Sequence, residues 1–256
     1  RTQEIIEKMK IDYIVPGCND RSYYVCAALN EKNNYFGLDT VETTEIINNK
    51  RKFRVFAAQN GLSVPRVIEK ELVDEKRPVI VKPVDAYSGR GMTILRKPDQ
   101  TTLQSAIDRA KEFSRSKTFI IEEYVEGQLY SHTAFIVDGN IFSDFIVEEY
   151  GTANPFVVDT SRVIYDFPLN TLKHIRESIE LLAKKLNLVD GLVHTQFIKN
   201  EDKLWLIEIT RRCPGDLYSQ LIELSTGFKY AETYAKPFVK QKLSFEKNTF
   251  KRTWLM

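Results

Sequence analysis

The stretch RPVIVKPVDAYSGRGMTIL, residues 77–95, decides the fold. A short apolar run ends at Lys82, a loop containing Gly89 and Gly91 follows, and a second apolar run closes the segment. Because an unpaired buried charge is costly, a lysine at the end of a buried strand must place its ammonium group in water or against an anion. Glycines let a loop turn sharply and offer backbone N–H groups to a phosphate. On these residues alone, an ordinary hairpin and a phosphate-binding loop explain the stretch equally well.

The composition is typical of a globular protein without a strong charge bias. Of 256 residues, 43% are hydrophobic and 28% are charged, and the formal net charge is +2. So small a charge argues weakly against nucleic acid as the main partner. No apolar run reaches the roughly 20 residues of a membrane-spanning helix, and no signal peptide is visible. Three cysteines fit neither a disulfide framework nor a zinc site, so we expect a cytoplasmic protein with no membrane partner.

The first 42 residues predict a small piece of an α/β domain. Residues 11–17 read as a short buried strand closed by Pro16 and Gly17, and residues 21–31 read as a helix. A helix–strand–helix run of this kind is typical of a doubly wound sheet. It is short for a complete domain, and we expect earlier βα units upstream of Arg1.

From residue 43 onward, strands and helices mix without strict alternation, which predicts α+β packing. Helices are expected at 44–59, ending at Asn60-Gly61, at 101–114, with Thr101 or Thr102 as the cap, at 171–187, and at about 217–224. Strands are expected at 65–71, 78–84, 118–125 and 160–168, with hairpins at 129–151, turning at 138–140, and at 191–212, turning at 200–203.

The segment FIIEEYVEG, residues 119–127, places two carboxylates at the end of an apolar strand. In a strand Glu122 and Glu123 point to opposite faces, so they cannot perform one task together. The backbone at such a strand end can read the edge of an adenine. An edge strand that meets solvent is the alternative, and the segment alone favours it.

The hairpin around residues 200–203 carries the sharpest pattern. Glu208, Thr210 and Arg212 alternate by two, so all three project from one face. Pairing across the turn brings Gln196 close to opposite Glu208. Carboxylate and amide oxygens on one face suit a hard cation such as Mg²⁺ that bridges phosphate oxygens, whereas a solvated sheet face is the alternative. The opposite face is expected to be core, formed by Val193, Phe197, Trp205, Ile207 and Ile209.

Five stretches in this order resemble the ATP-grasp superfamily, of the carboxylate–amine (carboxylate–thiol) ligase type. They are NKRKFRVFAAQNGLSVP, VIVKPVDAYSGRGM, IIEEYVEGQLYS, GLVHTQF and LIEITRRCPGD, and the resemblance covers about residues 40–240. It implies an α+β two-lobe ATP-grasp fold, preceded by the C-terminal part of a small Rossmann-like (pre-ATP-grasp) α/β domain. The implied division is 1–42 for that remnant, 43–125 for the N-terminal lobe and 126–256 for the C-terminal lobe.

The resemblance also implies which residues hold ATP. Lys50 and Lys82 match the two phosphate-contacting lysines. The loop over the phosphates matches Ser88, Gly89, Arg90 and Gly91. The strand between the lobes, which reads adenine with its backbone and its first carboxylate, matches Glu122, Glu123, Tyr124 and Val125. Leu129 stands where a ribose-binding glutamate is usual, so ribose contacts must differ or come from Gln128.

For the metal and the substrate, the resemblance implies three ligands and one arginine. Glu208 matches the principal Mg²⁺ ligand, and Mn²⁺ is an alternative ion. Gln196 and Thr210 fall at the other two ligand positions, where a glutamate and an asparagine are usual. Both replacements lower the negative charge at the metal and put turnover in question. Arg212 matches the arginine that holds the substrate carboxylate or its acyl phosphate, and we count it with Lys82 as catalytic.

The implied reaction joins a small-molecule carboxylate to an amine through an acyl phosphate, giving ADP and phosphate. The mechanism needs no Ser-His-Asp or Cys-His arrangement, and we interpret Cys213, beside Arg212, as a structural or incidental thiol. Two alternatives stay open: a kinase, in which a hydroxyl takes the phosphate, and a binding or regulatory module with weakened catalysis. The sequence leaves the oligomeric state undecided, and a homodimer is compatible with it.

Overall fold

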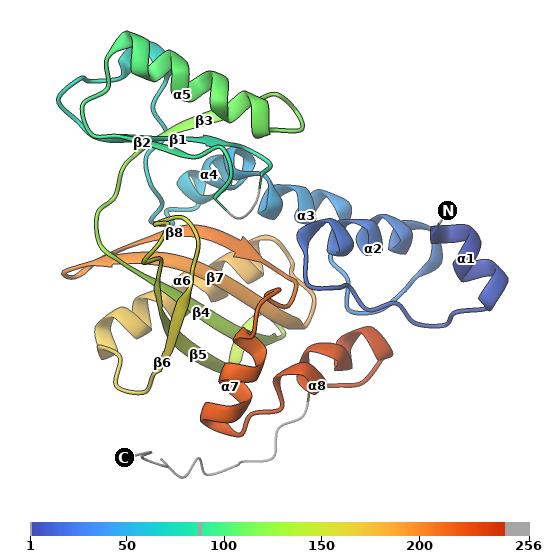
Figure 1. Cartoon of the computed structure of the whole chain (residues 1–256). Helices are drawn as coiled ribbons and strands as arrows, with labels where there is room; N and C mark the ends of the chain where they lie inside the picture. The colour runs from blue at the N-terminus through green and yellow to red at the C-terminus, as the bar shows by residue number, and fades with distance from the viewer. Residues whose placement is uncertain (1, 87–88, 244–256) are drawn as a thin grey trace.

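Two antiparallel sheets organise the computed structural model, which describes residues 2–86 and 89–243. The smaller sheet has the order β2-β1-β3 and the larger has the order β6-β5-β4-β7-β8. Figure 1 shows the smaller sheet above the larger one, with helix α4 between them. The strands are β1 Val79–Pro83, β2 Thr93–Leu95, β3 Phe119–Glu123, β4 Gln128–Val137, β5 Asn140–Tyr150, β6 Thr160–Ile164, β7 Gly191–Asn200 and β8 Lys203–Thr210.

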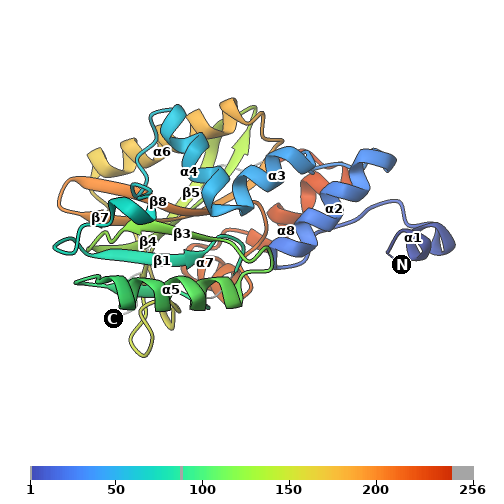
Figure 2. The same cartoon turned by 90° about the horizontal axis from the view of Figure 1, so that it is seen from above.

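Helices surround both sheets (Figure 2). They are α1 Thr2–Met9, α2 Asp20–Asn33, α3 Val41–Asn48, α4 Lys50–Gln59, α5 Gln100–Phe113, α6 Leu169–Lys185, α7 Tyr218–Thr226 and α8 Tyr230–Ala235, with short 3₁₀ turns at Lys70–Leu72 and Lys236–Val239. This α+β architecture of two sheet-based lobes is the fold class that the sequence predicts.

The smaller lobe has its own core. Helix α5 lies along β1 and β3, and its apolar stripe, which includes Leu103 and Ile107, packs on Val79, Val81 and Ile121. Strand β1 is central and buried along its whole length, paired with β2 on one side and β3 on the other. A buried central strand explains why the run before Lys82 is continuously apolar instead of alternating.

The larger sheet is covered on both faces. On one face, α6 packs together with α3 and α4, which contribute Ile47, Phe53 and Ala57 to that core. On the other face lie α7 and α8, together with Tyr23 from α2. The sequence division assigns α3 and α4 to the N-terminal lobe, but their buried side chains belong to the core of the larger sheet. The division at residues 42 and 125 stays a proposal.

Most predicted elements are present, and four expectations are wrong in detail. Residues 11–17 form no strand, because neither described sheet offers them a neighbour for backbone pairing. The helix expected over 44–59 is two helices, since Asn49 ends α3 and its side chain caps α4. Asp99, not a threonine, is the N-cap of α5, because its carboxylate accepts the Thr102 N–H. Of the strand expected at 65–71, only a bridge from Val67 to Glu122 forms.

A β-bulge at Ile207 corrects the expected core face of the second hairpin. Phe197 pairs with Leu206, whereas Gln196 pairs with Glu208, so Ile207 is the extra residue. The bulge shifts the alternation by one residue. As a result Leu204 and Leu206 face the core in place of Trp205 and Ile207, whereas Ile209 faces it as expected.

Within residues 2–86 and 89–243, no helix is both long enough and apolar enough to cross a bilayer.

Candidate active site

Lys50 and Lys82 reach the same region from different elements. Lys50 is the first residue of α4, and its backbone N–H donates to the carbonyl of Val84, directly after β1 (3.2 Å). Its ammonium group donates to the carbonyl oxygen of Ala86 (3.0 Å). The start of α4 is therefore fixed to the end of the strand that carries Lys82. Burial lowers the pKa of Lys82, and the nearby charges of Arg54 and Lys50 lower it further.

Lys82 belongs to a buried cluster of three charges. Its Nζ lies 2.7 Å from Oε2 of Glu122, and Nε of Arg54 lies 2.7 Å from Oε1 of the same carboxylate. Glu122 is fully buried. Burial alone would raise the pKa of Glu122, but Lys82 and Arg54 outweigh it and lower that pKa to about 2. The Glu122 carboxylate is ionised at neutral pH, and it holds Lys82 of β1 and Arg54 of α4 together on one side of the smaller sheet.

Of the two glycines after β1, Gly89 lies against the larger lobe and Gly91 lies against α5 of its own lobe. Gly89 has φ +67°, and a Cβ built there would lie 2.4 Å from Cβ of Phe156, in the loop between β5 and β6. Gly91 has φ +71°, and a Cβ there would lie 2.7 Å from Cβ of Phe113. Only glycine fits both the backbone conformation and the space. Arg90 is exposed between them, whereas Ser88 lies outside the described residues.

In the segment from the end of β3 to the start of β4, which joins the two lobes, most polar groups make hydrogen bonds to other protein groups. Glu123 accepts from the backbone N–H of Arg66 (3.0 Å), and the N–H of Tyr124 donates to the carbonyl of Pro78 (3.0 Å). Val125 is half-buried. The side-chain amide of Gln128 donates to the carbonyls of Leu129 and Glu149 (3.0 and 2.8 Å).

A row of polar side chains crosses the larger sheet on its α7 face. The sequence predicts Gln196 close to opposite Glu208, and the bulge at Ile207 places it directly opposite. The amide nitrogen of Gln196 donates to Oε2 of Glu149 on β5 (2.7 Å). This bond turns the amide oxygen of Gln196 away from Glu149. Glu149 is buried, and this burial raises its pKa. The nearby negative charges of Asp216 and Glu208 raise the pKa further.

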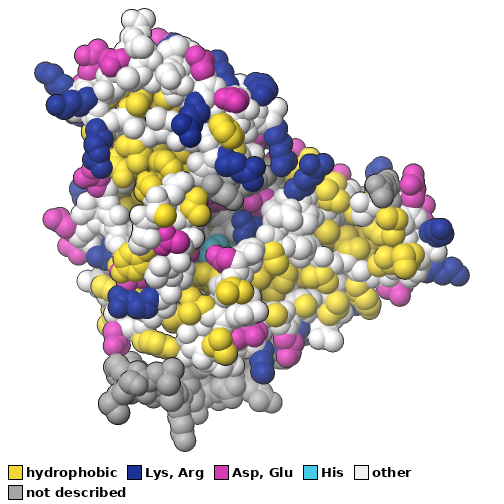
Figure 3. All heavy atoms as spheres, viewed as in Figure 1, with side chains coloured by type: hydrophobic (Ala, Val, Ile, Leu, Met, Phe, Trp, Pro, Cys, Tyr) yellow, Lys and Arg dark blue, Asp and Glu magenta, His cyan; other side chains and the backbone are white. Residues whose placement is uncertain are grey.

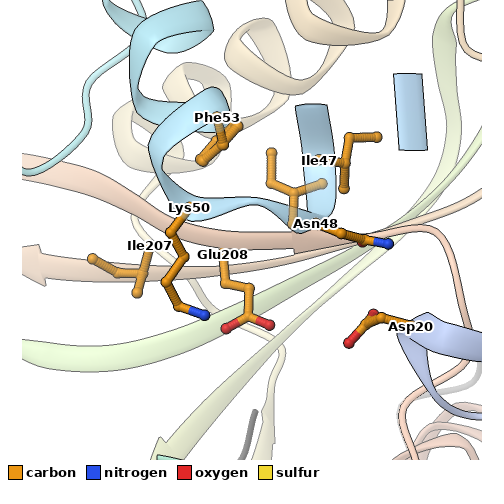
Figure 4. Close-up of a pocket in the computed structure, with 8 residues that line it drawn as sticks. Asp20, Ile47, Asn48, Lys50, Phe53, Ile207 and Glu208 are labelled. Carbon is orange, nitrogen blue, oxygen red and sulfur yellow. The ribbon is translucent and has the colours of Figure 1, made fainter. Parts of the chain in front are cut away.

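Thr210 and Arg212 meet at one partner, Asp20. The Thr210 hydroxyl donates to Oδ1 of Asp20 (2.8 Å), and Nε of Arg212 donates to the same oxygen (3.0 Å). Asp20 is the first residue of α2 and lines a pocket together with Lys50 and Glu208. In Figure 4, Lys50 and Glu208 lie side by side, with Asp20 across from them. The space-filling view shows a hollow between the lobes where acidic and basic side chains meet (Figure 3).

The match to a family model shows the family of the chain. Residues 75–220 match the model described as an ATP-grasp domain. The chain belongs to the ATP-grasp family. The match includes Lys82, Glu122 and Glu208, whereas Lys50 and Asp20 lie before it.

The chain is similar to the carbamoyl phosphate synthase large chain of Pseudothermotoga lettingae, with 25% identity over 95% of this chain and 23% of the relative. It spans about a quarter or less of the length of the curated relatives that it matches.

Among solved structures, the fold resembles the L-amino acid ligase of Bacillus licheniformis, with TM-score 0.76, 20% identity, and coverage of 93% of this chain and 58% of that one. It also resembles the biotin carboxylase domain of a Hydrogenobacter thermophilus 2-oxoglutarate carboxylase, in complex with MgADP, ADP and bicarbonate. Here the TM-score is 0.76 and the identity 14%, over 98% of this chain and 59% of the other. At these identities the likeness establishes the shared fold.

The oxygen donors of this ATP-grasp chain fit a hard divalent cation. Glu208 offers a half-buried carboxylate, and Gln196 directs its amide oxygen away from Glu149. Among the described residues, no three His, Cys, Asp or Glu side chains gather into a set that could hold a metal. A site of one carboxylate and one amide oxygen is consistent with Mg²⁺, which proteins usually hold by one or two carboxylates together with substrate phosphates.

Cys213 has the surroundings of a structural thiol. Cys213 is buried beside α7. Its pKa is raised to about 12, mainly by this burial and also by the neighbouring Cys18. A thiol that stays protonated at neutral pH is a poor nucleophile.

Sequence reasoning missed three residues of the site: Arg54, Glu149 and Asp20. Asp20 at the start of a helix looks like an ordinary helix-stabilising acid. Arg54 lies among the basic residues of α4 and gives no sign of burial. Glu149 had a signal, because FIVEEY at 145–150 repeats the pattern of FIIEEY at 119–124.

Proposed function

We propose that this chain is the ATP-binding part of an ATP-dependent ligase, which activates a carboxylate as an acyl phosphate and passes the acyl group to an amine. The observation that carries the proposal is the pocket between α2, α4 and β8. Lys50 and Glu208 line it together, and Arg212 lies beside it on Asp20. One cation for phosphate, one carboxylate for a metal and one guanidinium for an anionic substrate are the groups that such a reaction needs.

In this proposal ATP lies between the two lobes. Lys50 and Lys82 contact its phosphates, and the loop at Gly89–Gly91 covers them. The backbone of residues 123–125 reads the adenine, because the Glu122 carboxylate is already enclosed by Arg54 and Lys82. Gln128 is held by two carbonyls, so any ribose contact from it uses its amide oxygen.

Glu208 and Gln196 would hold Mg²⁺, with the Thr210 hydroxyl as a third oxygen. When bound, the ion neutralises phosphate oxygens and thereby favours phosphoryl transfer. The chain's own cations do the remaining electrostatic work. Lys82 is fixed by Glu122 before substrate arrives, so it needs no reorganisation when charge develops on the transferring phosphoryl group.

The reaction has two steps. A carboxylate oxygen of the substrate attacks the γ-phosphorus, the bond to the β-phosphate oxygen breaks, and ADP leaves. The amine nitrogen then attacks the acyl carbon, the C–O bond to phosphate breaks, and the nitrogen loses a proton. Arg212 binds the anionic oxygens of the acyl phosphate in both steps, and the Gly89–Phe156 contact helps to keep water from it.

Two measurements test the proposal. First, MgATP should raise the melting temperature, since a ligand that binds only the folded state stabilises it by mass action. Arg51→Met, on the exposed part of α4, is a control that should respond like the unmodified protein. An unchanged melting temperature at millimolar MgATP would exclude this function.

Second, ADP release should be measured against pooled carboxylates, with and without pooled amines. Release that requires both pools supports the ligase. Release with alcohols alone supports a kinase instead. Nucleotide binding without release under any combination supports the weakened module, which the replacement of two usual metal ligands by Gln196 and Thr210 favours as the second candidate.

A further inference from the structure

Two adjacent arginines follow β8, and each pairs with an aspartate from the first 40 residues. Arg211 Nε lies 2.7 Å from Oδ2 of Asp39, and Arg212 Nε lies 3.0 Å from Oδ1 of Asp20. The two pairs have the same chemistry and lie next to each other in the chain. They differ in how many guanidinium N–H groups remain available to a ligand once the aspartate is bound.

Arg211 is fully occupied by the protein. Besides Asp39, its Nη1 and Nη2 donate to the carbonyls of Leu192 and Val189, and its side chain is 3% exposed. Asp39 in turn accepts from the hydroxyl of Tyr23 (2.8 Å). Every group of this pair contacts protein, which is typical of an ion pair that holds the fold together.

Arg212 has capacity left. Asp20 takes the Nε–Nη2 edge, at 3.0 and 3.4 Å. Within residues 2–86 and 89–243, Nη1 makes only one long hydrogen bond, 3.4 Å, to the carbonyl of Cys213. The side chain is 18% exposed. Because a guanidinium is planar, fixing one edge also fixes the direction of the other edge.

Asp20 is built into this place more firmly than a helix-terminal acid requires. It is 5% exposed, and its Oδ1 also accepts the Thr210 hydroxyl at 2.8 Å. Acids at a helix N-terminus usually stabilise the helix from the surface. Asp20 instead turns toward the pocket that Lys50 and Glu208 line (Figure 4).

We propose that Asp20 is a positioning residue, which holds the guanidinium of Arg212 so that its remaining N–H groups meet the anionic group of the substrate. This inference rests on the proposed function, in which that group is a carboxylate and then an acyl phosphate. An unrestrained arginine loses much rotamer freedom when it binds a ligand. Asp20 imposes that order beforehand, so the ligand gains affinity from preorganisation.

The probe is inorganic phosphate, the second product, bound to the MgADP complex of the whole chain. Its affinity is measured by thermal shift or calorimetry in Asp20→Asn, Arg212→Gln and the double variant. Asparagine keeps an acceptor for Thr210 but loses the charge that orients Arg212. Asp39→Asn is the matched control, since it breaks the neighbouring buried pair and lies outside the site.

Asp20→Asn should weaken phosphate binding at least fivefold while the affinity for MgADP stays within twofold. The double variant should bind phosphate no more weakly than Arg212→Gln alone. Asp39→Asn should lower the melting temperature and leave phosphate affinity unchanged. Together these results separate positioning from a general loss of stability.

Unchanged phosphate affinity in Asp20→Asn overturns the inference, and so does an equal loss in Asp39→Asn. Unmodified protein that binds MgADP but not phosphate overturns it too, because Arg212 then holds no such anion. Failure of the unmodified protein to bind MgADP counts against the proposed function instead.

Discussion

Arg54 Nη2 donates a hydrogen bond to the carbonyl oxygen of Ile207 at 2.9 Å. Ile207 is the bulged residue of β8, and Glu208 follows it directly. The Nε and Nη2 groups of Arg54 also lie against the Glu122 carboxylate of the smaller lobe, at 2.7 and 3.4 Å. One buried arginine therefore connects the charge cluster around Lys82 to the point where the larger sheet presents its metal-ligand candidate.

Arg54→Met should be among the most destabilising substitutions of a charged residue. It leaves the Glu122 carboxylate buried with one cation and removes the hydrogen bond from Arg54 to the Ile207 carbonyl. Breaking a buried ion pair costs about 3–5 kcal/mol, which urea denaturation would measure. Arg51→Met, one turn away on α4 and half-exposed, should cost less than about 1 kcal/mol. Equal losses in the two variants would show that the Arg54 contacts contribute little.

The low pKa of Glu122 predicts how stability changes in acid. The folded value is about 2 and the ordinary value is 4.5, so the unfolded chain takes up the proton first as pH falls. The contribution of Glu122 is therefore complete above pH 4.5 and is lost between 4.5 and 2. By linkage it amounts to roughly 3 kcal/mol.

Glu122→Gln tests this by its pH dependence. The variant should be less stable than the unmodified protein at pH 7, and the difference in the free energy of unfolding should shrink steadily from pH 4.5 to pH 2. The neighbouring Glu123→Gln is the control, because Glu123 is partly exposed and its partner Arg66 is on the surface. A difference that stays constant over this range would contradict an ionised, paired Glu122.

Lys50 and Lys82 should separate nucleotide binding from folding. Lys50→Met removes one contact, to the Ala86 carbonyl, so the melting temperature without ligand should hardly change. Its affinity for MgATP should fall about tenfold, which corresponds to about 1.4 kcal/mol. Lys82→Met should lose affinity and also stability, because Glu122 then keeps only Arg54. Lys52→Met, exposed and paired with Glu45, should change neither. Normal MgATP affinity in both site variants would exclude phosphate binding by these lysines.

The sequence was enough for those parts of the site that lie close together along the chain. The turn at 200–203 was enough to place Gln196 close to Glu208, because a short hairpin leaves little choice of register, and the bulge at Ile207 brings the two residues directly opposite each other. The lysine at the end of β1 was visible because it interrupts an apolar run. The bulge at Ile207 was not visible, since nothing in the local pattern distinguishes it from regular alternation.

Contacts between distant segments decided the rest. FIIEEY and FIVEEY share one pattern, yet Glu122 binds Arg54 and Lys82 whereas Glu149 binds Gln196. Which carboxylate of each pair becomes a site residue depends on the element packed against it, and the strand sequence does not contain that information. Asp20 is 192 residues from its partner Arg212, and no spacing rule connects them.

Gly89→Ala tests the contact between the lobes. Alanine is strained in the left-handed backbone conformation of Gly89, φ +67°. Its Cβ would also lie 2.4 Å from Phe156 Cβ and 2.8 Å from the Phe156 carbonyl oxygen. Gly61→Ala is a matched control, since Gly61 has φ +70° but nothing within 4 Å of the added Cβ. The control should lose only the backbone term, about 1 kcal/mol.

Because the contact joins the loop after β1 to the loop between β5 and β6, Gly89→Ala should push the two apart. We expect it to lose more stability than Gly61→Ala, and to bind MgATP several-fold more weakly while Gly61→Ala binds normally. Thermal denaturation and calorimetry measure the two effects separately. If both alanine variants bind MgATP equally well, the loop at Gly89 does not act as a cover over the phosphates, and shielding of the acyl phosphate must come from another segment.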